Sequence, residues 1–221
     1  MKTVLKHIVG RTYKPFLEKW LSKTRPYRQG NLDLDISPDV FHPGFFSSTQ
    51  FLWNFLSKEN LIGKKLLELG AGSGFIAMRA YKRGAIVTAT DINAIAIGYL
   101  RSNSAKNDCS LQIIHSDMFE QVPAQTFDII AINPPYYKKD PVAPIEFAWY
   151  CGEDGAYFRK LFEQLGSFIH ANSEVYMVCC DGCDLQMIRE LARTHGYQLH
   201  CKRRKPTVLE TNFIFKIEVL P

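Results

Sequence analysis

The amino-acid sequence predicts a doubly wound α/β fold built on a mostly parallel sheet. Short apolar runs alternate along the chain with stretches of helical periodicity, and most of these runs are continuous, as in strands buried on both faces. Right-handed helical crossovers join such strands into one sheet. The final two runs alternate apolar with polar residues and have no long helix between them, which predicts an antiparallel pair of strands.

The positions of the runs give the expected elements in order. Five buried strands are expected at Lys65–Leu69, Ala85–Thr90, Leu111–His115, Phe127–Ile132 and Glu174–Cys180. Helical patterns cover Thr49–Lys58, Gly74–Arg83, Asn93–Asn107, Asp154–His170 and Leu185–His195. The antiparallel pair covers Gln198–Arg203 and Asn212–Val219.

The net charge of +5 is concentrated at the start of the chain. Residues 1–30 hold eight lysines and arginines against one glutamate, a net charge of +7, so the rest of the chain carries −2. This basic arm predicts contact with an anionic partner, or alternatively a solvated amphipathic helix. The stretch Thr24–Gly44 is rich in Pro, Gly and Asp, and we interpret it as a linker that breaks regular structure. An arm and linker over residues 1–44 therefore precede a domain over 45–221.

Composition narrows the class of protein further. The chain is 46% hydrophobic and 22% charged, as in ordinary globular proteins, and no apolar run approaches the ~20 residues that span a bilayer. Residues 1–10 lack the apolar stretch of a signal peptide. We therefore expect a cytoplasmic protein, monomeric and without a membrane partner, whose six cysteines are mostly thiols.

Polar residues stand where four of the apolar runs stop: Glu68, Asp91, Asp117 and Asn133. In a doubly wound sheet, ligands bind beyond the carboxyl ends of the strands, at the point where the strand order reverses. The four side chains are therefore expected to gather around one site.

The first stop opens a glycine-rich loop, in which Gly70, Gly72 and Gly74 follow Glu68. Glycines allow a sharp turn and a close approach of a ligand to the backbone. A dinucleotide site prefers G-x-G-x-x-G and a pyrophosphate, which the Glu68 carboxylate would repel. The loop therefore favours a ligand with an ammonium or sulfonium group.

The next two stops predict contacts to an adenosine. Asp91, followed by Ile92, places a carboxylate where it can accept both hydroxyls of a ribose, although it could instead cap the following helix. Asp117 could accept the exocyclic amine of adenine while the backbone N–H of Met118 meets a ring nitrogen, or it could be an ordinary turn residue. Together they indicate an adenosine with a positively charged tail.

The fourth strand stops at Asn133, Pro134, Pro135 and Tyr136. Asn-Pro-Pro is by itself a turn signal, but here it stands beside the expected ligand. Prolines lack N–H groups, so the loop offers rigid carbonyl acceptors. The Asn133 side-chain oxygen and the Pro134 carbonyl could hold the two hydrogens of a planar –NH₂ group, with Tyr136 stacked on it.

Four runs carry a resemblance to a known family: LLELGAGSGFIA, TDINAIAI, HSDMF and FDIIAINPPYY. They resemble the class I methyltransferases that act on nitrogen, and within them the HemK-type release-factor glutamine methyltransferases. The blocks at 145–149 and 151–155, and His42-Pro43-Gly44 with Ser48-Thr49, are similar to further family motifs. Likeness covers about residues 40–220, so the resemblance implies a methyltransferase domain over 45–221.

The resemblance implies a seven-stranded sheet, S-adenosylmethionine as cofactor and a glutamine of a protein such as a release factor as substrate. Cys151 departs from the glycine usual in the family, and a short basic arm replaces its N-terminal helical domain. A second interpretation is an RNA or DNA N-methyltransferase, because enzymes that methylate exocyclic amines of adenine or guanine share the Asn-Pro-Pro-Tyr motif. A third interpretation is a cofactor-binding module or a nucleotide-binding oxidoreductase, but a protein without transfer chemistry has no need of a rigid acceptor loop at this position.

Two further clusters have two interpretations each. Cys179, Cys180 and Cys183 lack the second pair or the histidine of a zinc site, which favours buried thiols over a metal site. The basic run Lys202–Lys205 could follow phosphates, but an exposed edge strand often carries such charges, and we favour the edge strand.

Overall fold

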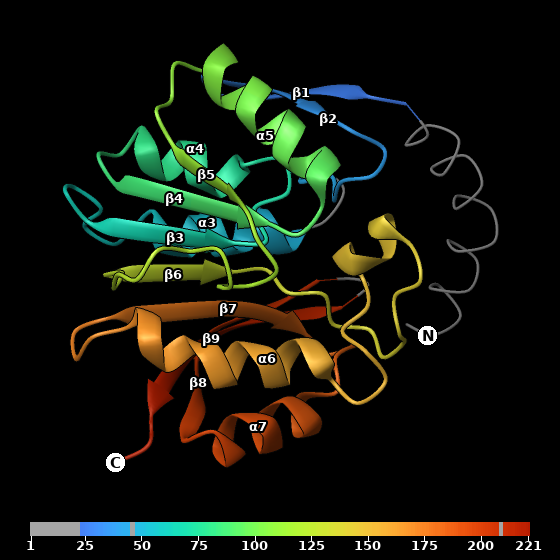
Figure 1. Cartoon of the computed structure of the whole chain (residues 1–221), viewed down its shortest axis with the longest axis vertical. Coiled ribbons are helices and arrows are strands. Elements are labelled where there is room, and N and C mark those ends of the chain that lie inside the picture. The colour runs from blue at the N-terminus through green and yellow to red at the C-terminus, as the bar shows by residue number, and fades with distance from the viewer. Residues whose placement is uncertain (1–22, 45–46, 208–209) are drawn as a thin grey trace.

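A seven-stranded sheet forms the centre of the computed structural model, which describes residues 23–44, 47–207 and 210–221 (Figure 1). The strand order is β5-β4-β3-β6-β7-β9-β8. The pairs from β5 to β7 are parallel, and β9 runs antiparallel to both β7 and β8. The strands are β3 (Lys65–Leu69), β4 (Ile86–Asp91), β5 (Gln112–His115), β6 (Ile129–Ile132), β7 (Glu174–Cys180), β8 (Tyr197–Pro206) and β9 (Thr211–Val219). The predicted doubly wound sheet with its antiparallel C-terminal pair is confirmed.

Helices cover both faces of this sheet (Figure 1). On one face pack α3 (Ser47–Leu56), α4 (Phe75–Tyr81) and α5 (Ala94–Lys106), and on the other α6 (Ala156–Leu165) and α7 (Leu185–Thr194). Each face holds its own apolar cluster, so the central strands β3, β6 and β7 are buried on both sides. No helix in these ranges is long and apolar enough to cross a membrane.

Two predicted elements differ from the structure. β5 is an outer strand with only half-buried and exposed residues, so the expectation that it is buried on both faces is wrong. In the described residues no further strand pairs with its outer edge. The helix expected over Asp154–His170 starts only at Ala156, because Gly155 takes a left-handed φ of 68° before it. It ends at Leu165 and continues as the 3₁₀ turn η2 (Gly166–Phe168).

The stretch Thr24–Gly44, predicted to lack regular structure, contains a β-hairpin. Within it β1 (Arg25–Gln29) pairs antiparallel with β2 (Leu32–Ile36). The prediction is wrong because LDLDI alternates with a period of two, which buries the leucines and the isoleucine against the domain while the aspartates stay at the surface. Of the basic arm expected over residues 1–30, residues 1–22 lie outside the described residues.

The hairpin is held by a pair of asparagines one turn apart, Asn103 in α5 and Asn107 at its C-cap. Asn103 accepts from the backbone N–H of Asp35 (2.8 Å) and donates to its carbonyl (3.0 Å). Asn107 does the same with Asp33, at 3.0 and 2.7 Å. The two side chains thus satisfy the edge of β2 as a neighbouring strand would. This fixes the start of the loop 37–44, which leads to the functional site.

The basic run Lys202–Lys205 lies on β8, the outer strand at the other side of the sheet. All four side chains are exposed, and the pairing with β9 is irregular between Cys201 and Arg203. This position agrees with the edge-strand interpretation, since charges and bulges both discourage pairing with another chain. Of the three cysteines expected to be buried thiols, Cys179 and Cys180 are 1% exposed at the end of β7, whereas Cys183 is only half-buried.

Candidate active site

The carboxyl ends of the central strands meet beside two adjoining pockets. The first, here called the Asn133 pocket, is lined by Asp39, Val40, Phe41, Gly72, Asp91, Ile92, Asn93, Ala96, Asn133, Pro134, Pro135, Tyr136, Phe147 and Ala148. The second, the Asp117 pocket, is lined by Leu69, Gly70, Thr90, Ile92, Ser116, Asp117, Met118, Pro135, Asp140, Pro141, Phe147, Tyr150, Cys151, Gly152, Ala156, Tyr157 and Lys160. Three residues line both: Ile92, Pro135 and Phe147. The pockets therefore form one elongated site.

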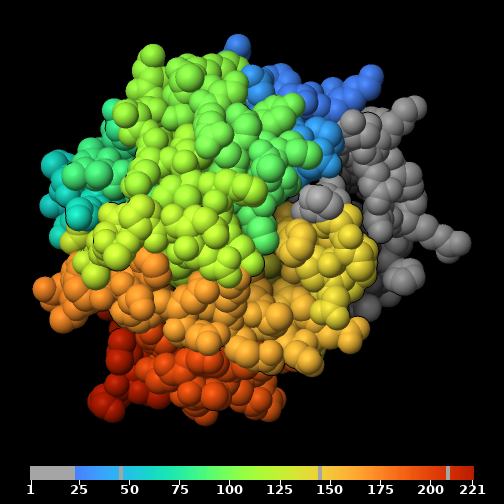
Figure 2. Space-filling view, in the orientation of Figure 1, coloured from blue at the N-terminus to red at the C-terminus, as the bar shows by residue number. Residues whose placement is uncertain are grey.

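The segment before α6 builds one side of this site. It runs from the end of β6 through the 3₁₀ turn η1 (Pro144–Ala148) to Gly155. Figure 2 shows its yellow surface standing against the green surface of α5 and the chain that follows it. Both pockets use residues of this segment and of the strand ends, so the site lies where these parts of the molecule meet.

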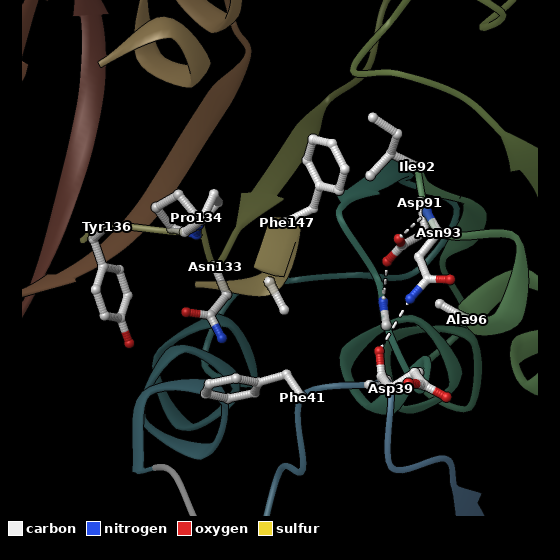
Figure 3. Close-up of a pocket in the computed structure, with 14 residues that line it drawn as sticks. Asp39, Phe41, Asp91, Ile92, Asn93, Ala96, Asn133, Pro134, Tyr136 and Phe147 are labelled. Carbon is white, nitrogen blue, oxygen red and sulfur yellow. Dashed lines mark hydrogen bonds between the residues drawn. The ribbon is translucent and has the colours of Figure 1, made fainter. Parts of the chain in front are cut away.

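The Asp91 carboxylate ends β4 at the wall of the Asn133 pocket (Figure 3). Its Oδ2 accepts from the backbone N–H of Gly72 and its Oδ1 from that of Asn93, both at 2.8 Å. Burial raises the pKa of Asp91, and these N–H donors oppose that shift. A carboxylate has about four acceptor positions, so further donors such as ribose hydroxyls fit beside these two. Asp91 thus orders the loop and stays available to a ligand.

Two of the three glycines of the glycine-rich loop line the pockets, and the third lies beneath the loop. Gly70 and Gly72 line the site, and both have left-handed φ angles, 73° and 53°. Gly74 does not line either pocket; it has a φ of 81°, and a Cβ there would come within 2.2 Å of Leu100 Cδ1. This residue therefore allows the close packing of α4 on α5 and acts on the site only through the loop.

Glu68 also lies beneath the loop and not in either pocket wall. Its Oε2 accepts from the backbone N–H of Ala77 at 2.6 Å, in the first turn of α4. Gly74, the N-cap of that helix, has no side chain to offer, so Glu68 supplies the missing cap from β3. Burial raises the pKa of Glu68 to about 8. The predicted contact of Glu68 with a cationic ligand stays a prediction.

At the far end of the site, Asp117 and Met118 follow β5 and line the Asp117 pocket. The Lys160 ammonium on α6 donates to Asp117 Oδ2 at 2.6 Å and also pairs with Glu120. Met118 has a φ of 56°, a left-handed conformation rare for a residue with a side chain. Such backbone strain is concentrated at ligand sites, which agrees with the expected role of Met118.

Asn133 leaves β6 and enters the pocket named after it (Figure 3). Its Nδ2 donates to Thr49 Oγ1 at 3.1 Å. Its Oδ1 is buried and has no hydrogen-bond partner among the residues that the structure describes. Buried acceptors are normally paired, so an orphan acceptor in a pocket indicates a place for a ligand donor. Pro134 and Pro135 line the same pocket.

Tyr136 closes the Asn133 pocket on the side away from Asp91 (Figure 3). Its backbone N–H donates to the Trp149 carbonyl at 3.2 Å, which ties the Asn-Pro-Pro-Tyr loop to the end of η1. Burial raises the pKa of the Tyr136 hydroxyl, so the ring stays neutral. Phe41, whose ring packs 5.2 Å from that of Trp149, completes this apolar side of the site.

Several residues of the site were not predicted from the sequence. Phe41 lies in the stretch that the sequence predicts to be a linker, and Phe147 lies in a block that is similar to a family motif. Lys160 lies in a predicted helix, where the sequence pattern does not distinguish it as a site residue. Thr49 belongs to a motif that is similar to one of the family, but the resemblance implies no role for this residue. Cys151, the departure from the family pattern, is buried, and it lines the Asp117 pocket. Only their positions in space connect these residues to the site.

The strand order, the reversed strand β9 and a site at the carboxyl ends of β3, β4 and β6 define a Rossmann-like methyltransferase fold. The model of the methyltransferase small domain matches residues 32–146. The chain belongs to this methyltransferase family.

Curated relatives carry names that agree with this family. The chain is 33% identical over 129 residues to a putative protein N5-glutamine methyltransferase of Methanocaldococcus jannaschii, covering 56% of this chain and 63% of that protein. It is 31% identical over 150 residues to a release factor glutamine methyltransferase of Agrobacterium fabrum, covering 61% of this chain and 51% of that one. In both cases the chain spans less than two thirds of the relative's length.

Solved structures share the fold. The E. cuniculi Mtq2–Trm112 complex, described as responsible for methylation of the eRF1 translation termination factor, matches with a TM-score of 0.63 and 21% identity, over 82% of this chain and 99% of that one. A T. Thermophilus 16S rRNA methyltransferase in complex with AdoMet and guanosine matches with a TM-score of 0.63 and 16% identity, over 88% and 50%.

Proposed function

We propose that this protein transfers a methyl group from S-adenosylmethionine to the side-chain amide nitrogen of a glutamine in a protein such as a release factor. The buried, unpartnered Oδ1 of Asn133 is the observation that carries the proposal, because an amide –NH₂ group brings the donors which this acceptor lacks. The names of the curated relatives and the protein substrate of the Mtq2 complex support a glutamine acceptor.

The residues at the strand ends fit an adenosine with a cationic tail. Asp91 and Asp117 each have carboxylate acceptor positions left for the ribose hydroxyls and the adenine amine, and Met118 lies beside Asp117. The two aspartates that line the site would disfavour a pyrophosphate. When bound, S-adenosylmethionine supplies an electrophilic methyl group on a sulfonium.

Asn133 and Pro134 prepare the nitrogen that accepts the methyl group. The lone pair of an amide nitrogen is delocalised into its carbonyl, so the nitrogen is a weak nucleophile. Hydrogen bonds from its two N–H groups to Asn133 Oδ1 and to the Pro134 carbonyl favour a pyramidal nitrogen with an available lone pair. The N–CH₃ bond would form as the S–CH₃ bond breaks, with S-adenosylhomocysteine as the leaving group. No dedicated base is needed before attack, because the nitrogen becomes strongly acidic only as it is methylated and then loses a proton to water. Positioning of this kind can lower a barrier by ~7–11 kcal/mol.

The aromatic rings of the site fit a planar acceptor. Tyr136 and Phe41 lie at the side of the Asn133 pocket away from Asp91, with Phe147 between them and Ile92 (Figure 3). A planar amide gains from stacking on such faces and from exclusion of water. Asp91 and Asn133 line the same pocket, so the cofactor and the acceptor would meet within it, and Ile92, Pro135 and Phe147 would join it to the Asp117 pocket.

A second candidate is the exocyclic amine of adenine or guanine in RNA or DNA. The specific observation in its favour is the run Lys202–Lys205 on β8, whose four exposed cations form no ion pair in the described part of the chain. The rRNA methyltransferase that shares the fold was solved with guanosine. The Asn133 acceptor would serve an exocyclic amine in the same way.

One experiment separates the two candidates. The protein is incubated with S-adenosylmethionine labelled in its methyl group and either a glutamine-bearing release-factor substrate or total RNA and DNA. Label that protease releases and nuclease does not, with mass spectrometry placing the methyl on a glutamine, is the expected result. Nuclease-sensitive label would favour the second candidate. No transfer to either, together with binding of NAD and not of S-adenosylhomocysteine, would overturn the proposal.

A further inference from the structure

In the part of the chain that the structure describes, one side-chain hydrogen bond to Asn133 decides which end of its amide faces the pocket. The Nδ2 group donates to Thr49 Oγ1 at 3.1 Å, and Oδ1 is left buried without a partner. We infer that Thr49 is a positioning residue for methyl transfer: it occupies the donor end of the Asn133 amide so that the acceptor end receives the target nitrogen. This inference rests on the proposed function.

The reason lies in the two-sided chemistry of an amide. Oδ1 accepts hydrogen bonds and Nδ2 donates them, and the two ends are nearly equal in size. Rotation of the Asn133 side chain by half a turn would therefore present N–H groups to a target –NH₂ that also carries only N–H donors. A donor facing a donor forms no hydrogen bond and leaves a buried polar group unsatisfied. The orientation of this amide thus decides whether the pocket can hold its acceptor nitrogen.

Thr49 is well placed to select that orientation. It lies in the first turn of α3 and is 7% exposed. Buried residues on the same helix, among them Leu52 and Leu56, anchor α3 on the sheet. A threonine side chain is also stiff, because its two branches at Cβ restrict χ1. The Oγ1 acceptor is therefore fixed relative to β6, which ends at Asn133, although 84 residues of chain separate the two side chains.

Substitution of Thr49 tests this role with a matched control elsewhere. Thr49→Val keeps the shape and removes the acceptor, whereas Thr49→Ser restores it. Thr88→Val removes a comparable hydroxyl, 4% exposed, whose Oγ1 donates to Gln112 Oε1 at 3.0 Å on β4, away from both pockets. The full chain of each variant is compared in single-turnover methyl transfer, in S-adenosylhomocysteine affinity and in thermal stability.

We expect Thr49→Val to slow single turnover by about 10- to 100-fold, because a misaligned group in an active site costs rates of that order. The affinity of Thr49→Val for S-adenosylhomocysteine should stay within about twofold of the parent, because Thr49 lines neither the Asn133 pocket nor the Asp117 pocket. Thr49→Ser should recover most of the rate and Thr88→Val should keep it. In an Asn133→Ala background, Thr49→Val should cause no further loss, because it acts through Asn133.

Three results would overturn the inference: a full rate in Thr49→Val, no recovery in Thr49→Ser, or a loss that multiplies with that of Asn133→Ala. A spectroscopic measurement keeps this test separate from the proposed function. The side-chain amide resonances of Asn133, assigned by their disappearance in Asn133→Ala, should shift in Thr49→Val and stay in place in Thr88→Val. If the parent methylates no substrate, the proposed function fails, and unmoved resonances in Thr49→Val would by themselves refute the inference.

Discussion

Lys160 on α6 donates a hydrogen bond of 2.6 Å to the carboxylate of Asp117, which lies after β5. The ammonium group of Lys160 therefore restrains the Asp117 side chain. Both residues line the Asp117 pocket. The bond uses Oδ2 of Asp117 and leaves Oδ1 for the proposed hydrogen bond from the adenine amine of the cofactor. A carboxylate held in this way loses less conformational freedom on binding than a free one.

Lys160→Met should therefore weaken S-adenosylhomocysteine binding by about 3- to 10-fold, as a restrained hydrogen-bonding group becomes mobile. Isothermal titration calorimetry measures the change. Lys216→Met is the matched control, because Lys216 pairs with Glu174 and Glu218 on β7 and β9 and lines neither pocket. Equal affinities in the two variants would show that Lys160 has no role in cofactor binding.

Asp91→Ala should lower cofactor affinity by about 10- to 100-fold, since hydrogen bonds to a charged group contribute ~1.5–3 kcal/mol. Asp128→Ala is the control, because Asp128 also accepts a hydrogen bond from a backbone N–H (Lys65, 2.8 Å). Asp128 lies at the amino end of β6, however, and the site lies at the carboxyl ends of the strands. Both substitutions should lower the thermal stability, whereas only Asp91→Ala should lower the affinity for the cofactor. An affinity within twofold of the parent would mean that Asp91 only orders the loop through Gly72 and Asn93.

Asn133→Ala should reduce turnover by about 100- to 1,000-fold, the usual loss when one group that stabilises a transition state is removed. Cofactor affinity should stay within about twofold, because the side chain is proposed to contact the acceptor nitrogen and an interaction that strengthens in the transition state is lost in turnover. Steady-state kinetics on the active substrate and calorimetry on the same sample check both statements. Undiminished turnover would contradict the mechanism.

Glu68 should make the stability of the protein depend on pH. Burial raises its pKa to about 8, so the folded protein keeps a proton that the unfolded chain releases near the ordinary glutamate pKa of 4.5. The free energy of unfolding should therefore fall as the pH rises from about 5 to about 8. Glu68→Gln keeps an oxygen for the Ala77 N–H and should flatten this fall. Urea unfolding of both proteins across that range decides the point; parallel curves would contradict it.

Removal of residues 1–22 should weaken capture of an anionic substrate, because this segment holds five lysines and arginines against one glutamate. The truncation stops before Arg25–Gln29, which form β1. Turnover of a short, uncharged acceptor at saturation should not change. Binding measured at several salt concentrations should show a smaller salt dependence for the truncated protein. Identical salt curves would favour the solvated helix over a binding arm.

The sequence predicts most of the sheet because runs buried on both faces, such as Glu174–Cys180, differ clearly from the helices between them. It also places Asp91, Asp117 and Asn133 at strand ends, where the structure brings them to one site. The hairpin was missed because Pro, Gly and Asp outweighed a two-residue alternation only five residues long.

The remaining part of the site depends on contacts between distant segments. Thr49 meets Asn133 across 84 residues, and Lys160 meets Asp117 across 43. Local periodicity contains no information on such pairs, because they arise from the packing of α3 and α6 on the sheet. For Glu68 the sequence identifies the residue but not its position. Its burial under the glycine-rich loop, where it caps α4, follows from the fold alone.

The position of β9 between β7 and β8 affects how the molecule is made. β8 pairs with β9 and not with β7, so it joins the sheet only through a strand that the ribosome makes later. Until Thr211–Val219 has emerged, the outer edge of β7, one of the most apolar strands, stays open. Open apolar edges recruit strands of other chains, which makes nascent chains prone to aggregate. A chaperone that shields a half-made sheet would therefore matter most while the ribosome adds the residues between β7 and β9.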